Sequence, residues 1–419
     1  MADRESSGEP VAIFSAKDNG SFHLDSKALE RILLADHVRD KPVVVVSMAG
    51  AFRKGKSFLL NFFIRYLRNQ CRSDWLKESD APLDGISWRG GSERDATGIL
   101  VWSEVFLVTT PQGEELAVLL MDTQGSYDNV STIDECTTTF ALSTMLSSVL
   151  IYTLSENIQQ NDIQHLQLFC DYAYLAQKEV HGTPFQNLLI LVRDWCCLRE
   201  AGYGKQGGCM MVHRWLETSR DQDWLKGLRR DIHDCFDDIS GFLMPHPGLK
   251  VATEPEFEGR LSKMDAAFKE QLEKLVPLIL EPGHVAPKRV NGREITCEQL
   301  KTLFEVSSGE FCRGTLPSPT SLRQATGVET NLAATKNALE HYELLMDEHC
   351  SDGYLSPDLL ITAHEKQRAA ALNLFDRMVK LGGRDLAGHY RRNLLQEIQI
   401  MYKRYVRRNL NKKSDCTLM

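Results

Sequence analysis

One short stretch of the chain has the residue types that bind the phosphates of a nucleotide. Residues 50–57, Gly-Ala-Phe-Arg-Lys-Gly-Lys-Ser, fit the pattern G-x-x-x-x-G-K-S. In this pattern the backbone N–H groups of the loop and the following helix surround the phosphates, Lys56 reaches the β- and γ-phosphates, and Ser57 binds Mg²⁺. An ordinary glycine turn is the alternative. The valine run at 43–46 and the amphipathic helical pattern that begins at the lysine favour a nucleotide site.

A second group of candidate residues follows the apolar stretch 115–121. Asp122 comes directly after it, and Gly125 completes a D-x-x-G pattern. An aspartate at the carboxyl end of a buried strand suits the carboxylate that holds Mg²⁺ through water, and the glycine offers a backbone N–H to the γ-phosphate. D-x-x-G alone is common, but downstream of a phosphate loop it indicates a nucleotide hydrolase.

A third candidate lies after the apolar stretch 187–192, where the chain reads Arg193-Asp194-Trp195. Ligands of doubly wound sheets bind outside the carboxyl ends of the strands, so a residue that reads the base is expected here. A carboxylate accepts N–H donors of guanine that adenine does not offer in the same arrangement. Asp194 therefore suits a guanine base, although the common N-K-x-D pattern is absent from the chain.

The three groups of candidate residues can form one site only if the strands that precede them end side by side in a sheet. Apolar runs predict strands at 43–46, 99–109, 115–121, 149–153 and 187–192, with helices after the phosphate loop and over about 159–179. This order predicts an α/β fold, a P-loop domain with a mostly parallel central sheet and helices on both faces. The polar segment 80–98 lies where nucleotide hydrolases sense the γ-phosphate. The glycine-rich stretch 202–208 is predicted to be a flexible loop.

The C-terminal part of the chain has helical periodicity. Apolar residues at 261, 264, 268, 272 and 275 predict a helix that Pro277 bends or ends. A short helix at 297–306 and a linker at 307–319, rich in Gly, Pro and Ser, separate a domain over 1–306 from an all-α three-helix bundle over 320–410. The apolar stripe of the first bundle helix is predicted to consist of Leu332, Leu339, Tyr342 and Leu345.

The tail at 411–419 contains a candidate lipidation site. Cys416 is fourth from the end and the last residue is Met419, which matches the C-a-a-X prenylation pattern. One lipid chain holds a membrane marginally, whereas a lipid chain with a basic patch, at about 1 kcal/mol per basic residue, holds it stably. Six basic side chains lie just upstream of the cysteine. The alternatives are a chance cysteine and a solvated helix face.

Composition restricts the class of protein. The chain has 419 residues, of which 42% are hydrophobic and 25% charged, as in soluble globular proteins. Its net charge of −8 argues against nucleic acid as the main partner. We find neither a signal peptide nor an apolar run long enough to span a bilayer. The 11 cysteines, without C-x-x-C pairs, indicate a reducing cytosolic environment, and Cys196-Cys197 is interpreted as loop or core thiols.

Taken together, the motifs resemble those of the atlastins, membrane-fusing GTPases of the dynamin superfamily, and more distantly those of guanylate-binding proteins. The matching stretches are GAFRKGKS at 50–57, SWRGGS at 87–92, TGI at 97–99, LMDTQG at 120–125, LVRDW at 191–195 and PHPGLKVAT at 245–253. The bundle is similar through QAT at 324–326 and NLAA at 331–334.

The resemblance implies roles that spacing does not show. Arg53 corresponds to the family's internal arginine finger, which stabilises charge on the transferring phosphoryl group once two GTPase domains dimerise; such a group is worth roughly 10³–10⁵ in rate. Thr97 corresponds to the switch threonine that joins Ser57 and, through water, Asp122 on Mg²⁺. A simple surface or dimer-contact arginine is the alternative for Arg53. The implied nucleotide-binding residues are Gly50, Arg53, Lys54, Gly55, Lys56, Ser57, Phe58, Asp122, Gly125, Arg193 and Asp194.

The resemblance therefore implies a Mg²⁺-dependent GTPase that hydrolyses GTP to GDP and phosphate, forms a homodimer through its GTPase domain, and tethers, remodels or fuses membranes. By family analogy it would work on the cytoplasmic face of a membrane, with the endoplasmic reticulum favoured. Two departures keep alternatives open. Ala96 replaces a second threonine beside the switch threonine, and no transmembrane hairpin follows the bundle. A nucleotide-gated membrane scaffold or a coat like that of guanylate-binding proteins would also fit.

Overall fold

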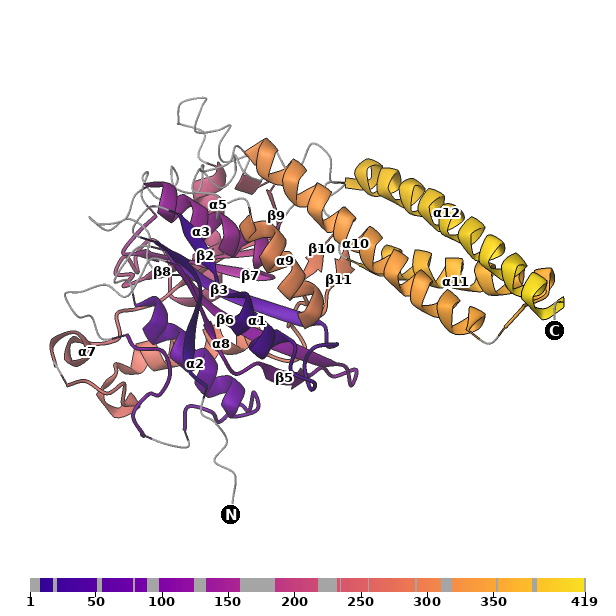
Figure 1. Cartoon of the computed structure of the whole chain (residues 1–419). Helices are drawn as coiled ribbons and strands as arrows, with labels where there is room; N and C mark the ends of the chain where they lie inside the picture. The colour runs from indigo at the N-terminus through magenta and orange to yellow at the C-terminus, as the bar shows by residue number, and fades with distance from the viewer. Residues whose placement is uncertain are drawn as a thin grey trace, which may run out of the picture. The chain divides into compact units, whose positions relative to one another are not determined.

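One large β-sheet is the centre of the fold. The computed structural model describes residues 8–17, 21–50, 55–77, 80–88, 98–123, 133–158, 185–217, 232–233, 235–254, 256–290, 292–309, 319–351, 353–378 and 383–417. The strands of the sheet are β1 (Pro10–Ala16), β2 (Phe22–Leu24), β3 (Val43–Gly50), β4 (Gly98–Trp102), β5 (Phe106–Thr109), β6 (Glu115–Thr123), β7 (Val149–Ser155), β8 (Phe185–Arg193) and β9 (Phe236–Leu243). Among the described residues their order is β2-β1-β4-β6-β3-β7-β8-β9, with β5 paired to β6 (Figure 1). A separate two-stranded sheet pairs β10 (Arg289–Val290) with β11 (Arg293–Glu294).

The part of the sheet from β6 to β9 is parallel. β3 lies between β6 and β7, and all of its residues are buried. A continuous run of apolar β-branched residues is the pattern of a strand that is covered on both faces. The antiparallel strands β1, β2, β4 and β5 lie beyond β6. The α/β fold class predicted from the sequence is confirmed.

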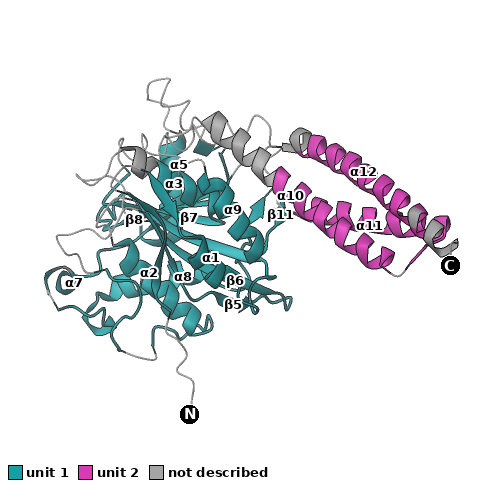
Figure 2. Ribbon diagram, viewed as in Figure 1, with its two compact units in different colours: residues 1–178, 182–320 teal, residues 179–181, 321–419 magenta. Residues whose placement is uncertain are grey.

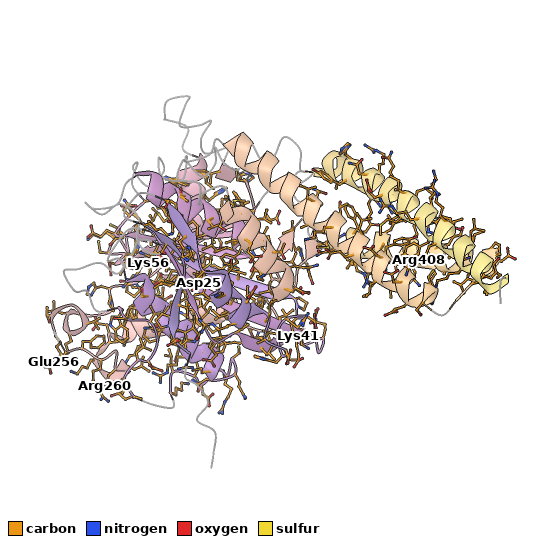
Figure 3. All side chains as sticks on the ribbon, viewed as in Figure 1. Asp25, Lys41, Lys56, Glu256, Arg260 and Arg408 are labelled. Carbon is orange, nitrogen blue, oxygen red and sulfur yellow. The ribbon has the colours of Figure 1, made fainter. Side chains whose placement is uncertain are left out.

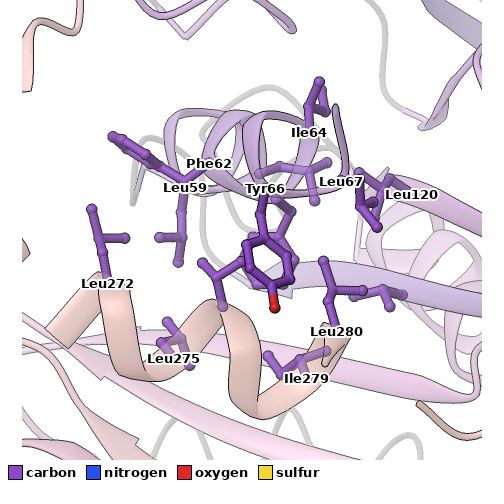
Figure 4. Close-up of a cluster of buried hydrophobic side chains, with 14 of the residues drawn as sticks. Leu59, Phe62, Ile64, Tyr66, Leu67, Leu120, Leu272, Leu275, Ile279 and Leu280 are labelled. Carbon is purple, nitrogen blue, oxygen red and sulfur yellow. The ribbon is translucent and has the colours of Figure 1, made fainter. Parts of the chain in front are cut away.

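Helices cover both faces of the sheet. They are α1 (Ser26–Leu33), α2 (Lys56–Arg68), α3 (Ile133–Leu146), α5 (Gly204–Glu217), α7 (Leu249–Thr253), α8 (Ala266–Leu280) and α9 (Cys297–Gly309), with a 3₁₀ turn at Leu261–Lys263. Figure 4 shows α2 and α8 presenting buried apolar side chains to one another next to Leu120 of β6. Because side chains alternate along a strand, Ser47 of β3 points to the other face, where its hydroxyl accepts from Ser147 Oγ, just after α3.

Several sequence predictions for this region are corrected by the structure. The stretch 202–208, predicted to be a flexible loop, contains the start of α5. Its glycines let the helix approach the sheet, since a Cβ on Gly208 would lie 2.2 Å from the Gly241 carbonyl carbon in β9. Pro277 lies inside α8, which continues to Leu280. The predicted strand at 99–109 is two strands, and α9 extends to Gly309, into the predicted linker.

The chain divides into two compact units (Figure 2). Residues 1–178 and 182–320 form the N-terminal unit; residues 179–181 and 321–419 form the other, here called the helical unit. The helices of this second region are α10 (Pro319–Cys350), α11 (Pro357–Arg377) and α12 (Gly383–Thr417). Ser356 caps α11, and its hydroxyl accepts from the Leu359 N–H. In α10 the predicted stripe is wrong at Leu332, which is 51% exposed, while Ala334 and Ala338 are fully buried.

The last turns of α12 close the helical unit. The Asn409 amide exchanges two hydrogen bonds with the backbone of Leu355, of 2.9 and 2.8 Å, in the connection between α10 and α11. Lys412 Nζ donates to the Cys350 carbonyl oxygen at 2.5 Å, at the C-terminus of α10. A lysine at this position satisfies a helix-end carbonyl and complements the helix dipole. Lys412, one of the six basic residues upstream of Cys416, therefore also has a structural contact.

Candidate functional site

Two glycines shape the loop between β3 and α2. Gly50 ends β3 with φ +137°, and a Cβ there would lie 2.3 Å from the Thr153 carbonyl oxygen in β7. Gly55 precedes the first residue of α2 with φ +67°, and its Cβ would lie 1.9 Å from Arg193 Nη1. At Gly50 both the backbone angle and the Thr153 backbone disfavour a larger side chain, and at Gly55 the left-handed backbone angle favours glycine. The glycines of the sequence pattern are therefore explained by this geometry.

Lys56, labelled in Figure 3, begins α2 as the sequence predicts, and its side chain reaches back to the end of β3. The Nζ atom donates to the Gly50 carbonyl oxygen at 3.1 Å, and the residue is only 6% exposed. No side chain in the described part of the chain caps the first turn of α2. The first N–H groups of a helix have no acceptor within the helix, and together with the helix dipole and the ammonium they favour an anion at this point.

Ser57 and Asp122 meet beside the lysine. Ser57 Oγ donates to Asp122 Oδ2 at 2.5 Å, and the second oxygen, Oδ1, is buried with no hydrogen-bond partner among the described residues. Parallel pairing puts Asp122 opposite Met48 in β3, which brings the carboxylate close to the phosphate loop. A hydroxyl and a carboxylate next to an anion site are the oxygen donors that Mg²⁺ prefers.

The electrostatics of Asp122 agree with a cation site. Burial raises the pKa of this carboxyl above its usual range, while the positive charge of Lys56 and the hydrogen bond from Ser57 act in the opposite direction. A buried carboxylate with an unpaired oxygen is costly unless a cation or donor satisfies it. The residues present therefore fit a divalent cation, and Ser57 and Asp122 are the described side chains that would hold it.

Arg193 and Asp194 lie at the carboxyl end of β8. Asp194 has φ +58°, an unusual backbone angle for a residue with a side chain, and its Oδ2 accepts from Ser155 Oγ at 3.3 Å. Its Oδ1 is buried without a hydrogen-bond partner in the described ranges. The Arg193 guanidinium packs on Gly55, and burial lowers its pKa while the negative charge of Asp194 raises it. Arg193 thus contacts the phosphate loop at Gly55, and the adjacent Asp194 is the residue predicted to bind the guanine base.

Comparison with known proteins identifies the family. Residues 19–288 match the family described as guanylate-binding protein, N-terminal domain. Atlastin-3 of Homo sapiens is 46% identical over 411 residues, which span 97% of this chain and 76% of the relative. Atlastin-1 of Pongo abelii is 46% identical over 406 residues, 96% of this chain and 73% of the relative. Atlastin-2 of Macaca fascicularis is 45% identical over 404 residues, 96% of this chain and 72% of the relative.

The chain belongs to the atlastin family of GTPases. The resemblance deduced from the motifs is confirmed, and so is the enzyme class. In the described part of this atlastin-family chain, no helix has both the length and the hydrophobicity of a membrane-spanning segment. Nor do the described residues contain a cluster of three or more His, Cys, Asp or Glu side chains that could hold a metal ion.

The structure of this atlastin-family chain brings together only part of the predicted site. Gly50, Gly55, Lys56, Ser57, Asp122, Arg193 and Asp194 lie along the carboxyl ends of β6, β3, β7 and β8. Arg53, Lys54, Thr97 and Gly125 lie outside the described residues. The Phe58 ring packs in the core against Phe62, so only its backbone N–H can face a phosphate. The backbone of α12 includes Cys416, whose side chain is not among those described.

Sequence reasoning missed two residues of β7. Thr153 supplies the carbonyl against which Gly50 packs, and its Oγ1 is buried without a hydrogen-bond partner in the described residues. Ser155 donates to Asp194, as described above. The signal for both was available, because β7 was predicted as a strand and its carboxyl end must lie between the phosphate loop and Asp194 in a parallel sheet.

Proposed function

We propose that this GTPase hydrolyses GTP to GDP and phosphate in a Mg²⁺-dependent reaction at the carboxyl ends of β6, β3, β7 and β8. The observation that supports it most is the Ser57–Asp122 pair beside the buried ammonium of Lys56; one carboxylate oxygen of the pair has no partner among the described residues. Bound Mg²⁺ would supply charge neutralisation for the β- and γ-phosphates.

The side chains of this chain have separate roles in the proposed reaction. Lys56 and the N–H groups of the loop, including those of Gly55 and Phe58, bind phosphate oxygens. Ser57 and Asp122 orient the cation, and Thr97 completes its ligand set. Asp194 accepts hydrogen bonds from guanine, for which its second oxygen is unpaired among the described residues. The backbone N–H of Gly125 binds the γ-phosphate.

Arg53 is proposed to stabilise the charge that develops during phosphoryl transfer, after two copies dimerise through the N-terminal unit. Replacing it by alanine should lower the maximal turnover by about 10³-fold or more, the range for such an arginine. Turnover measured as a function of protein concentration should also lose its dependence on dimer formation. An Arg53→Ala variant with the parent rate would show that Arg53 has no part in phosphoryl transfer.

The first experiment is phosphate release by the purified chain with GTP and, in parallel, ATP. We expect turnover of GTP alone, abolished by a chelator and restored by Mg²⁺. Equal turnover of ATP would contradict the role of Asp194. Nucleotide that binds without turnover would contradict hydrolysis and favour the nucleotide-gated scaffold, with Ala96 as the first residue to change.

For the helical unit we propose a mechanical role at a membrane, in tethering or remodelling, with Cys416 as the lipid attachment site. The sequence pattern at 416–419 and the basic residues before it support this role. The cytoplasmic face of the endoplasmic reticulum is the location favoured by the family. Light scattering by liposomes carrying the lipidated protein should rise with GTP. Mass spectrometry that finds only unmodified Cys416 in the cell-derived chain would rule out the anchor.

A further inference from the structure

Two adjacent cysteines follow the residue proposed to bind guanine. Cys196 and Cys197 come directly after Asp194-Trp195, and their sulfur atoms lie 4.0 Å apart. Cys196 is exposed and Cys197 half-buried, whereas the other cysteines with described side chains are half-buried or buried. The proposed reaction uses neither thiol. Two neighbouring thiols that solvent reaches are suited to a reversible disulfide, because oxidation follows thiolate character and exposure.

The two sulfur atoms differ in their surroundings. Cys197 packs against the core cluster that contains Trp195. The hydrogen bond with Cys196 raises the pKa of the Cys197 thiol above its usual value. Cys197 therefore keeps its proton at neutral pH, and the exposed Cys196 is the sulfur that an oxidant meets first. Redox-sensing cysteines have this arrangement, in which a reactive thiol lies next to the thiol that resolves it.

The cysteines begin a turn that holds the side chain of Trp195. The Cys196 carbonyl accepts from the Leu198 N–H at 3.1 Å, and the Cys197 carbonyl accepts from the Ala201 N–H at 3.3 Å. The Ala201 carbonyl in turn accepts from Trp195 Nε1 at 2.9 Å. Because this indole N–H is buried, it has no water to replace the carbonyl if the turn moves.

Asp194 depends on the contacts of its neighbours. Its φ of +58° is uncommon for a residue with a side chain and persists only where surrounding contacts hold it. On one side, Ser155 Oγ donates to its carboxylate at 3.3 Å. On the other side, the Trp195 N–H donates to the Met244 carbonyl at 3.0 Å. A change in the turn at 196–201, which holds the Trp195 indole, therefore acts on a contact next to Asp194.

We propose that Cys196 and Cys197 form a reversible disulfide that lowers the affinity of the site for guanine. This inference rests on the proposed role of Asp194. The oxidant is hydrogen peroxide: the Cys196 sulfur attacks one oxygen, the O–O bond breaks, and a sulfenic acid and one water form. The Cys197 sulfur then displaces the hydroxyl from that sulfur, and its proton leaves with the hydroxyl as a second water. The two thiols lose two electrons, and the peroxide gains them.

Closing this bond changes the backbone of the turn. The Cα atoms of adjacent residues are about 3.8 Å apart across a trans peptide, less than the roughly 4.4–6.8 Å of ordinary disulfides. The strain falls on the peptide between the cysteines, whose carbonyl accepts from Leu198. We expect the contact between Trp195 and Ala201 to loosen with it. A strained disulfide is also easily reduced, so in a reducing compartment it forms only when peroxide rises.

Peptide mass tests the disulfide on the full chain. Trypsin cuts after Arg193 and Arg199, which isolates both cysteines in the peptide 194–199. After brief exposure to peroxide, unfolding and blocking of the remaining thiols, this peptide should carry no blocking group and be lighter by two hydrogens than the reduced peptide. Dithiothreitol should reverse the change. A sulfinic acid, or a cross-link to a different cysteine, as the main product would overturn the proposal.

Nucleotide competition tests the coupling to guanine. GDP and ADP compete with a fluorescent GDP analogue for the reduced and the oxidised chain. We expect oxidation to lower GDP affinity about 10-fold or more, as for the loss of a hydrogen bond to a charged group. ADP affinity, which depends on the phosphates, should change less than about twofold. An equal fall for both nucleotides, or no fall once the disulfide has formed, would overturn the coupling.

Serine variants assign the effect to this pair. Cys196→Ser and Cys197→Ser should bind GDP like the reduced parent and should not respond to peroxide. Cys209→Ser is the matched control, because Cys209 is a half-buried thiol that contacts the Gly241 carbonyl, and it should keep the response of the parent. A response that persists in both variants of the pair would contradict the proposal. If the reduced parent binds GDP and ADP equally, the proposed role of Asp194 fails and the coupling with it, while the peptide mass still decides whether the disulfide forms.

Discussion

Three buried polar side chains at the ends of the parallel strands differ from three others that lie between the helices of the helical unit. In the N-terminal unit, Asp122 Oδ1, Thr153 Oγ1 and Asp194 Oδ1 are buried and have no hydrogen-bond partner among the described residues. All three residues lie at the carboxyl ends of strands in the parallel part of the sheet. These residues therefore lie at the end of the sheet where α/β proteins bind ligands.

In the helical unit, the buried side chains of Tyr342, His364 and Gln367 each have a polar partner. Tyr342 OH and His364 Nδ1 are 2.9 Å apart, and the His364 ring stacks on Tyr402 at 3.9 Å between centroids. Gln367 Nε2 and His349 Nε2 are also 2.9 Å apart. These contacts join α10, α11 and α12 to one another.

The difference separates binding from stability. An unpaired buried acceptor costs about 1–3 kcal/mol, so it persists where a ligand or ion satisfies it or where strain is tolerated. Polar side chains that pair with one another need no ligand or ion to satisfy them, and they make the packing of the helices specific. We therefore expect substitutions in the first set to change nucleotide chemistry, and substitutions in the second to change only the free energy of unfolding.

The largest effect is expected for Lys56→Ala. Loss of the ammonium beside the Gly50 carbonyl should lower GTP turnover by about 10²–10³-fold or more, as for the loss of a preorganised charge-stabilising donor. Phosphate release and binding of a fluorescent GDP analogue measure it. Lys41→Ala is the control, since Lys41 makes a surface ion pair with Glu115 that should contribute little. Unchanged turnover in Lys56→Ala would contradict the assignment of nucleotide chemistry to the N-terminal unit.

A smaller effect is expected for Asp194→Asn. The substitution keeps the shape but loses a charged acceptor, so the preference for GTP over ATP should fall about 10- to 100-fold, the worth of a hydrogen bond to a charged group. Competition between the two nucleotides for the fluorescent analogue gives the ratio. Asp238→Asn, on an exposed residue of β9, should leave the ratio unchanged. A preserved preference would mean that other residues read the base.

Lys288 refines the comparison between the two units. It is a buried basic residue of the N-terminal unit that, unlike Asp122 Oδ1, has a hydrogen-bond partner among the described residues. It is 2% exposed, and its Nζ donates to the Ser147 carbonyl oxygen at 2.8 Å, just after α3. Burial lowers the pKa of Lys288 to about 7, against the opposing attraction of Asp237. The unfolded chain, with a pKa of 10.5, therefore binds more protons between pH 7 and 10.5. Stability should rise with pH in that window, by at most about 1.4 kcal/mol per unit.

Lys288→Met should remove this dependence. Between about pH 7 and 8.5, the free energy of unfolding of the parent should rise relative to that of the variant by up to about 2 kcal/mol. Urea denaturation at the two pH values measures the difference. GTP turnover per folded molecule should stay that of the parent. A variant that is as stable as the parent at both pH values, or one that loses turnover, would contradict this assignment.

The smallest effect is expected for Tyr342→Phe in the helical unit. Loss of the hydroxyl that pairs with His364 should lower the free energy of unfolding by about 1 kcal/mol. GTP turnover should not change. Denaturant midpoints and phosphate release, measured on the full chain, check both statements. A loss of turnover here would show that the helical unit contributes to the chemistry and would break the division between the units.

The sequence alone predicts the part of the site that depends on local pattern. The strand at 43–46, the start of α2 at Lys56 and Asp122 at the end of β6 were all predicted, because an apolar run, a glycine pair and a strand-end carboxylate are neighbours along the chain. The roles of these residues in catalysis stay predictions.

The parts that were missed depend on contacts between distant residues. Nothing near Arg193 indicates that its guanidinium packs on Gly55, and nothing near Asn61 indicates its contact with Ile86. Gly208 suggested a loop because glycine is a poor helix former, but close packing of α5 on β9 outweighs that propensity. Likewise, apolar character alone made Leu332 a core residue, whereas smaller alanines occupy the helix interface.

The closure of the helical unit by α12 has a mechanical consequence. Asn409 is bonded to Leu355, Lys412 to the end of α10, and Arg408 to Asp347 at 3.3 Å. Tension applied near the end of α12 would load these bonds together, in shear, before it could peel one helix from the others. The load would pass at once to α10 and to the connection into α11. The three helices would then bear the tension together.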